Sequence, residues 1–127
     1  MYSPTLWQHY QSPKNRGSLD GANARGSSHF PKCGDEFHLY LLLEEGRILQ
    51  ARFQARACAP VIAVGSVGTQ LLQGLTLEQA GQILPTQLDQ AVGGLPAPKR
   101  HAIMLFLEAL YQALEPQINS TKEVILS

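Results

Sequence analysis

The sequence predicts an α+β fold, in which a small antiparallel β-sheet of about three strands is covered by helices on one face. Residues 36–57 alternate in polarity around the turn Glu45-Gly46, which is typical of a β-hairpin. Residues 99–115 carry apolar side chains at spacings of three and four, which is typical of an amphipathic helix packed on a sheet. A length of 127 residues fits one domain, residues 1–127.

Composition and charge narrow the class of protein. Hydrophobic residues make up 44% and charged residues 16%, which is enough apolar material for a core. Ten Lys and Arg residues balance ten Asp and Glu residues, and this zero net charge argues against a nucleic-acid partner and leaves self-association possible. We find neither a signal peptide nor an apolar run of membrane-spanning length, so we expect a cytoplasmic protein without a membrane partner.

The first third of the chain reads as a helix followed by a loop. Ser3 can cap a helix over residues 3–11, and Pro4 suits its first position. Residues 12–35 are rich in Gly, Ser, Asn and Pro, and we interpret them as a long loop with a short strand near residues 27–31. The glycines of this loop would allow it to open and close over a functional site.

The part after the hairpin reads as mainly helical. A helix over residues 60–73 begins with proline and stops before Gly74. Thr76 and Gln79 have the spacing of a capping box, which predicts a short helix that ends near residue 81 or 82. A further turn or two is expected over residues 85–92. The long helix over residues 99–115 is expected to end at Pro116, which leaves residues 119–127 at the periphery.

Two cysteines are too few for a disulfide scaffold, and both fall at element junctions. Cys33 and Asp35 precede the hairpin, Cys58 follows it at a helix N-terminus, and His101 begins the last helix. Together they offer two sulfurs, one oxygen and one nitrogen, a set that suits zinc or iron. The helix N-terminus should lower the pKa of Cys58. Inert core or loop cysteines and a surface histidine remain the alternative interpretation.

Two enzyme-like signals are weak. The stretch Gly65-Ser66-Val67-Gly68 lacks the lysine of a phosphate-binding loop and is better explained by close helix packing. The sequence shows no base to partner Ser66 and no Gly-x-Ser-x-Gly motif, so we do not expect hydrolase chemistry or an enzyme.

In their order along the chain, these junctions resemble the IscU/NifU-type, SufU-related family of iron–sulfur cluster assembly scaffolds over residues 2–114. The matching segments are Tyr2-Ser3, His9-Tyr10, Pro13–Gly17, Cys33-Gly34-Asp35, Ala51–Gln54, Ala57-Cys58-Ala59 with Ile62-Ala63 and Ser66, Gly74–Ala80, and Leu95–Lys99 followed by His101.

The resemblance implies a set of roles. Cys33, Asp35, Cys58 and His101, with a third cysteine, would hold iron, a nascent [2Fe–2S] cluster or zinc. A cysteine desulfurase would donate sulfur, and recipient apo-proteins would take up the cluster. The segment Leu95, Pro96, Ala97, Pro98 and Lys99 resembles the one that dedicated chaperones bind in IscU proteins.

The third cysteine of the family is replaced here by Ala102, which neither ligates metal nor accepts sulfur. Three hypotheses therefore stay open. The first is a scaffold or carrier for iron or a [2Fe–2S] cluster, the second is a zinc-binding adaptor or regulatory module that interacts with the assembly machinery, and the third is a sulfur relay through Cys33 or Cys58. Ala102 argues most strongly against the third.

Overall fold

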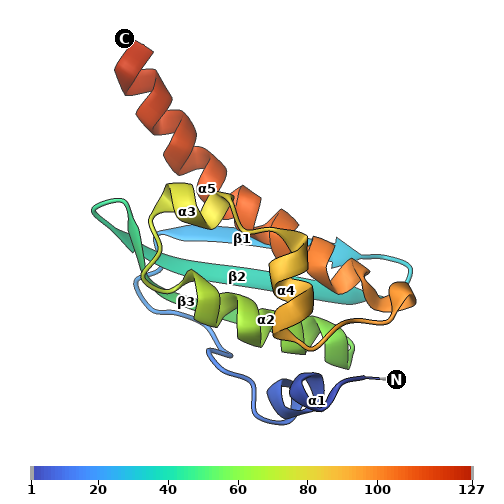
Figure 1. The fold of residues 1–127 in the computed structure, drawn as a ribbon. Helices are drawn as coiled ribbons and strands as arrows, with labels where there is room; N and C mark the ends of the chain where they lie inside the picture. Colours follow the sequence, from blue (N-terminus) through green and yellow to red (C-terminus); the bar gives the residue numbers. More distant parts are fainter. Residues whose placement is uncertain (1, 127) are drawn as a thin grey trace.

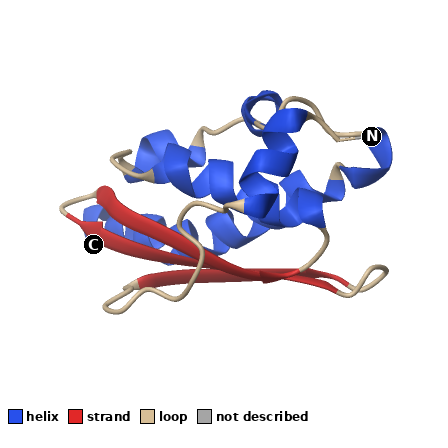
Figure 2. Ribbon diagram, turned by 90° about the horizontal axis from the view of Figure 1, so that it is seen from below, coloured by secondary structure: helices blue, strands red, loops and turns tan. Residues whose placement is uncertain are grey.

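The computed structural model describes the backbone of residues 2–126 and the side chains of residues 2–117. Its element order is α1 (Pro4–Gln11), β1 (Ala24–Phe30), β2 (Asp35–Glu44), β3 (Arg47–Arg56), α2 (Ala59–Leu72), α3 (Leu77–Gly81), α4 (Pro85–Ala91), the 3-10 helix η1 (Ala97–Lys99) and α5 (His101–Leu126). The three strands pair antiparallel in the order β1-β2-β3, and the helices gather on one face (Figures 1 and 2). The predicted α+β fold is confirmed.

Strand alternation divides the sheet into an inner and an outer face. Phe37, Leu39 and Leu41 of β2 are fully buried beneath the helices, as is Phe53 of β3. The residues between them point to the uncovered face and are polar or amphipathic. The turn between β2 and β3 places both Glu45 and Gly46 at positive φ, which suits a two-residue hairpin.

Strand β1 is longer than the sequence predicts and occupies part of the expected loop. Its inward residues are small because α5 crosses β1 closely, and a side chain at Gly26 would collide with the Ala109 carbonyl. Because close packing requires small residues here, the strand has a composition that is typical of a loop. Residues 15–17 are also fixed, since Gly17 N–H donates to Phe53 O at 2.7 Å and Phe53 N–H to Asn15 O at 3.0 Å. The expectation that residues 12–35 form one loop that opens and closes over the site is therefore wrong.

Most predicted helices are confirmed within a residue or two, and their caps are visible. The Ser3 hydroxyl accepts from Leu6 N–H, and Thr76 and Gln79 form the capping box. Glycine packing in α2 is confirmed too, because a side chain at Gly65 would meet the Phe53 ring and one at Gly68 the Phe106 ring.

The last helix continues through Pro116 to Leu126, so the predicted end at Pro116 is wrong. Proline removes the hydrogen bond to the carbonyl of Gln112, but Gln112 is exposed and water can satisfy that carbonyl. The C-terminal part of α5 extends beyond the sheet (Figure 1). Among the described residues, no helix is both long enough and apolar enough to span a membrane.

Candidate metal centre

Cys33 lies on the short turn that joins β1 to β2. Its N–H donates to Phe30 O at 3.1 Å, and Gly34 adopts a φ of +70°, a conformation that favours glycine. The thiol is exposed. The turn therefore presents a sulfur to solvent at one end of the sheet.

Asp35 is the first residue of β2 and points to the inner face, where it is only 4% exposed. Its Oδ2 atom lies 3.0 Å from His101 Nε2 and 3.5 Å from Cys58 Sγ. A single buried carboxylate oxygen therefore joins the start of β2, the N-terminus of α2 and the first residue of α5.

Cys58 is the N-cap residue of α2 and is half-buried. Burial raises the pKa of its thiol, and the charge of Asp35 and its hydrogen bond with the thiol act in the same direction. Hydrogen bonding from the Val61 backbone and the charge of Lys99 oppose this shift without reversing it. The expected lowering of this pKa is therefore wrong, because burial outweighs the helix N-terminus.

His101 is oriented from two sides. Its Nε2 faces Asp35, and its ring stacks on Phe30 with centroids 4.5 Å apart and planes 19° from parallel. Because Phe30 closes β1, the stacking ties the start of α5 to the strand that leads into the Cys33 turn.

These residues form one group, here named the Asp35 cluster: Cys33, Asp35, Cys58 and His101. Potential ligand atoms of Cys33, Asp35 and His101 lie within 4.8 Å of one another, and Cys58 joins through Asp35. The four residues singled out in the sequence converge as expected. That they bind a metal stays a prediction.

The segment 95–99 follows the connector that leads to His101. Leu95 is buried in the core, and its N–H donates to Asp89 Oδ1 at 2.8 Å. Ala97 and Pro98 are exposed, whereas Pro96 and Lys99 are half-buried. A partner that binds the folded protein could contact Ala97 and Pro98 but not the Leu95 side chain.

Sequence reasoning missed two neighbours of the cluster. Phe30 orients His101, and Lys99 lies close enough for its charge to act on Cys58. Phe30 precedes the Cys33 turn and Lys99 lies two residues before His101, so proximity in sequence was the available signal. Ala102, the next residue of α5, is fully buried in the core.

A second polar group lies between α1 and α2, where Ser66 does have a histidine neighbour. His9 Nδ1 lies 2.7 Å from Ser66 Oγ, and Lys14 N–H donates to the same oxygen at 2.8 Å. The absence of a base beside Ser66 was thus a wrong expectation. Ser66 is nevertheless fully buried, so its hydroxyl is shielded from solvent.

Comparison with known proteins places this chain in a family. The family model for the NifU-like N terminal domain matches residues 1–122, and the chain belongs to that family. The iron-sulfur cluster assembly scaffold protein IscU 1 of Archaeoglobus fulgidus is 36% identical over 114 residues, which cover 90% of this chain and 74% of that protein.

Two further relatives and one solved structure extend the comparison. The scaffold protein IscU of Azotobacter vinelandii is 34% identical, covering 89% of this chain and 91% of the relative. The nitrogen fixation protein NifU of Cereibacter sphaeroides is 43% identical over 81% of this chain but only 42% of its own length. The structure of FiSufU from Fervidobacterium islandicum AW-1 superposes with a TM-score of 0.73 at 20% identity, covering 89% of this chain and 96% of that one, which supports the fold. The chain is thus a member of an iron–sulfur cluster assembly scaffold family, and the two IscU relatives compared above are named as scaffold proteins, not as enzymes.

Proposed function

We propose that this protein transiently holds iron or a nascent [2Fe–2S] cluster at the Asp35 cluster, with Cys33, Cys58, Asp35 and His101 as ligands. The observation that supports this most directly is the meeting of His101 Nε2 and Cys58 Sγ on one Asp35 oxygen, with Cys33 nearby. Family membership supports it independently.

The donor set fits this cargo. Thiolates bind iron–sulfur clusters, and imidazole replaces thiolate on one iron in Rieske-type centres. A bound cation favours the thiolate form and would offset the effect of burial on the pKa of Cys58. Cys33 is exposed on a turn, so a recipient protein could reach the metal or cluster from this side. Asp35 is buried and would orient the site.

Partners follow from the same proposal. Sulfur would come from a cysteine desulfurase, and recipient apo-proteins would take up the cluster. A chaperone would use the segment 95–99, of which Ala97 and Pro98 are exposed. We place this work in the cytoplasm, where thiols stay reduced.

A zinc-binding adaptor is the second candidate function. It is favoured by Ala102, a buried methyl group at the position where the resembled family has its third cysteine. Two sulfurs, one nitrogen and one oxygen complete a tetrahedral zinc site without any further thiol. In this case the protein would interact with the assembly machinery without holding a cluster.

Anaerobic reconstitution with ferrous iron and sulfide separates these two functions. A scaffold should develop visible sulfur-to-iron charge-transfer absorption, which Cys33→Ser should abolish. Lys32→Ala, an exposed change in the same turn, is the matched control and should leave the absorption intact. A colourless protein that retains one zinc per chain after the same treatment, and that loses this zinc on Cys33→Ser, would reject the scaffold and support the adaptor.

The variant Ala102→Cys tests the missing ligand. If the parent holds no cluster and this variant does, the alanine accounts for the loss of scaffold activity. If both form clusters of equal stability, a third thiol is not needed here. Mass spectrometry of the parent protein after incubation with a desulfurase supplies a separate readout. Persulfide on Cys33 or Cys58 would show that the parent accepts sulfur with alanine at position 102.

A further inference from the structure

The uncovered face of the sheet carries a second group of metal-binding side chains, here named the outer triad: His29, Glu36 and His38. In the antiparallel register His29 lies directly opposite Glu36, and Ser27 lies opposite His38. Glu36 and His38 are two apart on β2, so alternation puts them on the same face. The register therefore gathers two imidazoles and one carboxylate on neighbouring positions.

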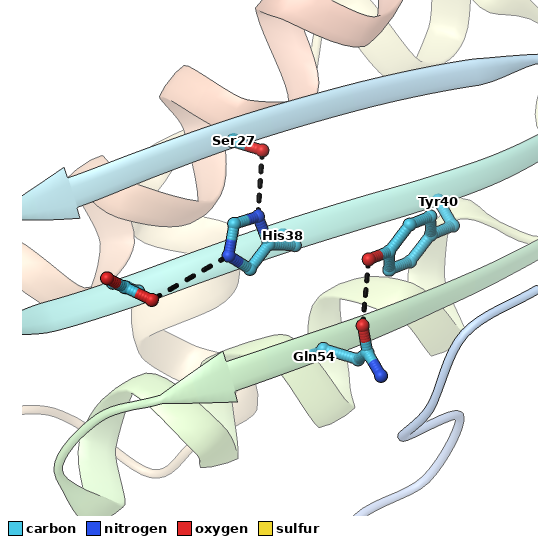
Figure 3. A network of polar contacts seen from close by, with 5 residues as sticks. Ser27, His38, Tyr40 and Gln54 are labelled. Carbon is cyan, nitrogen blue, oxygen red and sulfur yellow. Dashed lines mark hydrogen bonds and ion pairs between the residues drawn. The ribbon is translucent and has the colours of Figure 1, made fainter.

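The ring of His38 is held by contacts on both sides (Figure 3). Its Nδ1 lies 2.8 Å from Ser27 Oγ, and its Nε2 lies 3.9 Å from Glu36 Oε2. When Nδ1 carries the proton and donates it to Ser27, Nε2 presents its lone pair on the side of Glu36. A hydrogen bond of this kind on the far ring nitrogen commonly orients metal-binding histidines.

A hollow with a volume of about 220 Å³ lies over this group, lined by Ser27, Ser28, His29, Glu36 and His38. It has room for an ion and its water ligands. The Glu36 side chain is 55% exposed and that of His38 is 41% exposed, so both can be reached from solvent.

The outer triad is separate from the Asp35 cluster although the two are adjacent in sequence. Asp35 and Glu36 are consecutive, and they point to opposite faces of β2. Asp35 is buried under the helices, whereas Glu36 lies on the open face. A metal bound by one group is not bound by the other.

We propose that His29, Glu36 and His38 form a second site, which binds a divalent transition-metal ion such as Zn²⁺ or Fe²⁺ with water completing the coordination. Two histidines and one carboxylate are a donor set suited to both ions. In the described part of the chain, only Cys33, Asp35 and His101 already have three ligand atoms within 4.8 Å. Binding at the outer triad therefore requires these exposed side chains, His29 above all, to rotate toward the ion.

Arg56 gives the proposal an internal check. It lies opposite Glu36 on β3 and is exposed on the same face, so its positive charge opposes a bound dication. Replacing this charge by Arg56→Gln should tighten metal binding several-fold without adding a ligand.

The test is a Zn²⁺ titration against a chromophoric chelator, using the full chain with Cys33→Ser and Cys58→Ser so that no thiol competes. We expect one Zn²⁺ per chain, and an affinity lowered at least about tenfold by His29→Ala and by His38→Ala alike. Gln54→Ala, on the same face and hydrogen-bonded to Tyr40, is the control and should bind as the parent does. Circular dichroism verifies that each variant is folded.

Co²⁺ bound to the wild-type chain provides a second readout that does not depend on removing thiols. Imidazole and carboxylate ligands give only weak visible bands, whereas thiolates add intense charge-transfer absorption. The proposal expects a weak-band species that His29→Ala and His38→Ala remove while any thiolate species remains. Zn²⁺ binding in the thiol-free chain that survives both histidine changes, or that is absent at micromolar concentrations, would overturn the outer triad. Neither result bears on reconstitution at the Asp35 cluster.

Discussion

On the helical side of the sheet, two polar groups of the described residues are each built on a histidine and one oxygen. In the Asp35 cluster, His101 Nε2 lies 3.0 Å from Asp35 Oδ2. Between α1 and α2, His9 Nδ1 lies 2.7 Å from Ser66 Oγ, in a group that also includes Lys14 N–H, Asn15 and Thr69. We name this second group the Ser66 cluster.

The difference lies in what remains available to a ligand. In the Ser66 cluster, Asn15 Nδ2 donates to Thr69 Oγ1, and the Thr69 hydroxyl donates back to the helix carbonyl of Gly65. The Ser66 and Thr69 side chains are fully buried. The Asp35 cluster instead brings an exposed thiol and a half-buried thiol to a carboxylate. Groups of similar composition thus serve either to fix an N-terminal segment or to offer ligands, according to whether protein atoms already satisfy them.

Cys58→Ser should have the largest effect and should separate the two clusters. A hydroxyl is a poor ligand for zinc or iron, so the affinity of the Asp35 cluster for Zn²⁺ should fall at least about 100-fold, or roughly 3 kcal/mol. Thermal stability of the metal-free protein should change little, since serine is well suited to an N-cap position. Competition with a chelator, in a chain that carries His29→Ala and His38→Ala so that the outer triad does not bind, measures the first effect, and calorimetry measures the second. Unchanged affinity would remove Cys58 from the ligand set.

Ser66→Ala should show the opposite behaviour. The change leaves Lys14 N–H and the His9 ring without their partner in a partly buried setting, which should lower the free energy of unfolding by about 1 kcal/mol. Metal affinity should stay at the parent value. Ser18→Ala, on the exposed segment that follows α1, is the matched control and should be neutral. Loss of metal binding in Ser66→Ala would mean that the two clusters are coupled through α2.

Asp35→Asn should have a smaller effect on metal affinity than Cys58→Ser. The amide oxygen can still accept from His101, but the negative charge is lost, and metal affinity should fall on the order of tenfold. Denaturant unfolding of the metal-free chain checks that the fold is kept. An affinity equal to that of the parent would show that the carboxylate orients the site without contributing charge to it.

The parts of this picture that sequence could predict are those fixed by local chemistry. The alternation of residues 36–57, the cap at Ser3 and the capping box at Thr76 all involve neighbours in the chain, and all are confirmed. The sequence predicted part of strand β1 as loop, because its small residues are required by the close packing of α5, which comes far later in the sequence.

In the candidate site, too, the sequence predicted what depends on local position and missed what depends on contacts across the fold. Convergence of Cys33, Asp35, Cys58 and His101 could be expected from their places at element junctions, whereas the direction of the Cys58 pKa could not. That direction depends on the depth of burial and on a contact with Asp35 across the fold. The pairing of His9 with Ser66 likewise joins residues 57 apart in sequence, which no local pattern indicates.

The smallest expected effect concerns the pH dependence of the Ser66 cluster. Burial lowers the pKa of His9 in the folded state, and the positive charge of Lys14 lowers it further. Since the unfolded chain then takes up a proton more readily, the contribution of His9 to stability is present above its unfolded pKa of about 6.5 and is lost as the pH falls through the folded pKa. His9→Asn can keep a polar contact with Ser66 without titrating, so its free energy of unfolding should fall less between pH 7 and pH 5 than that of the parent. Urea titrations at each pH measure the difference, and parallel declines in the two proteins would show that His9 is not the group responsible.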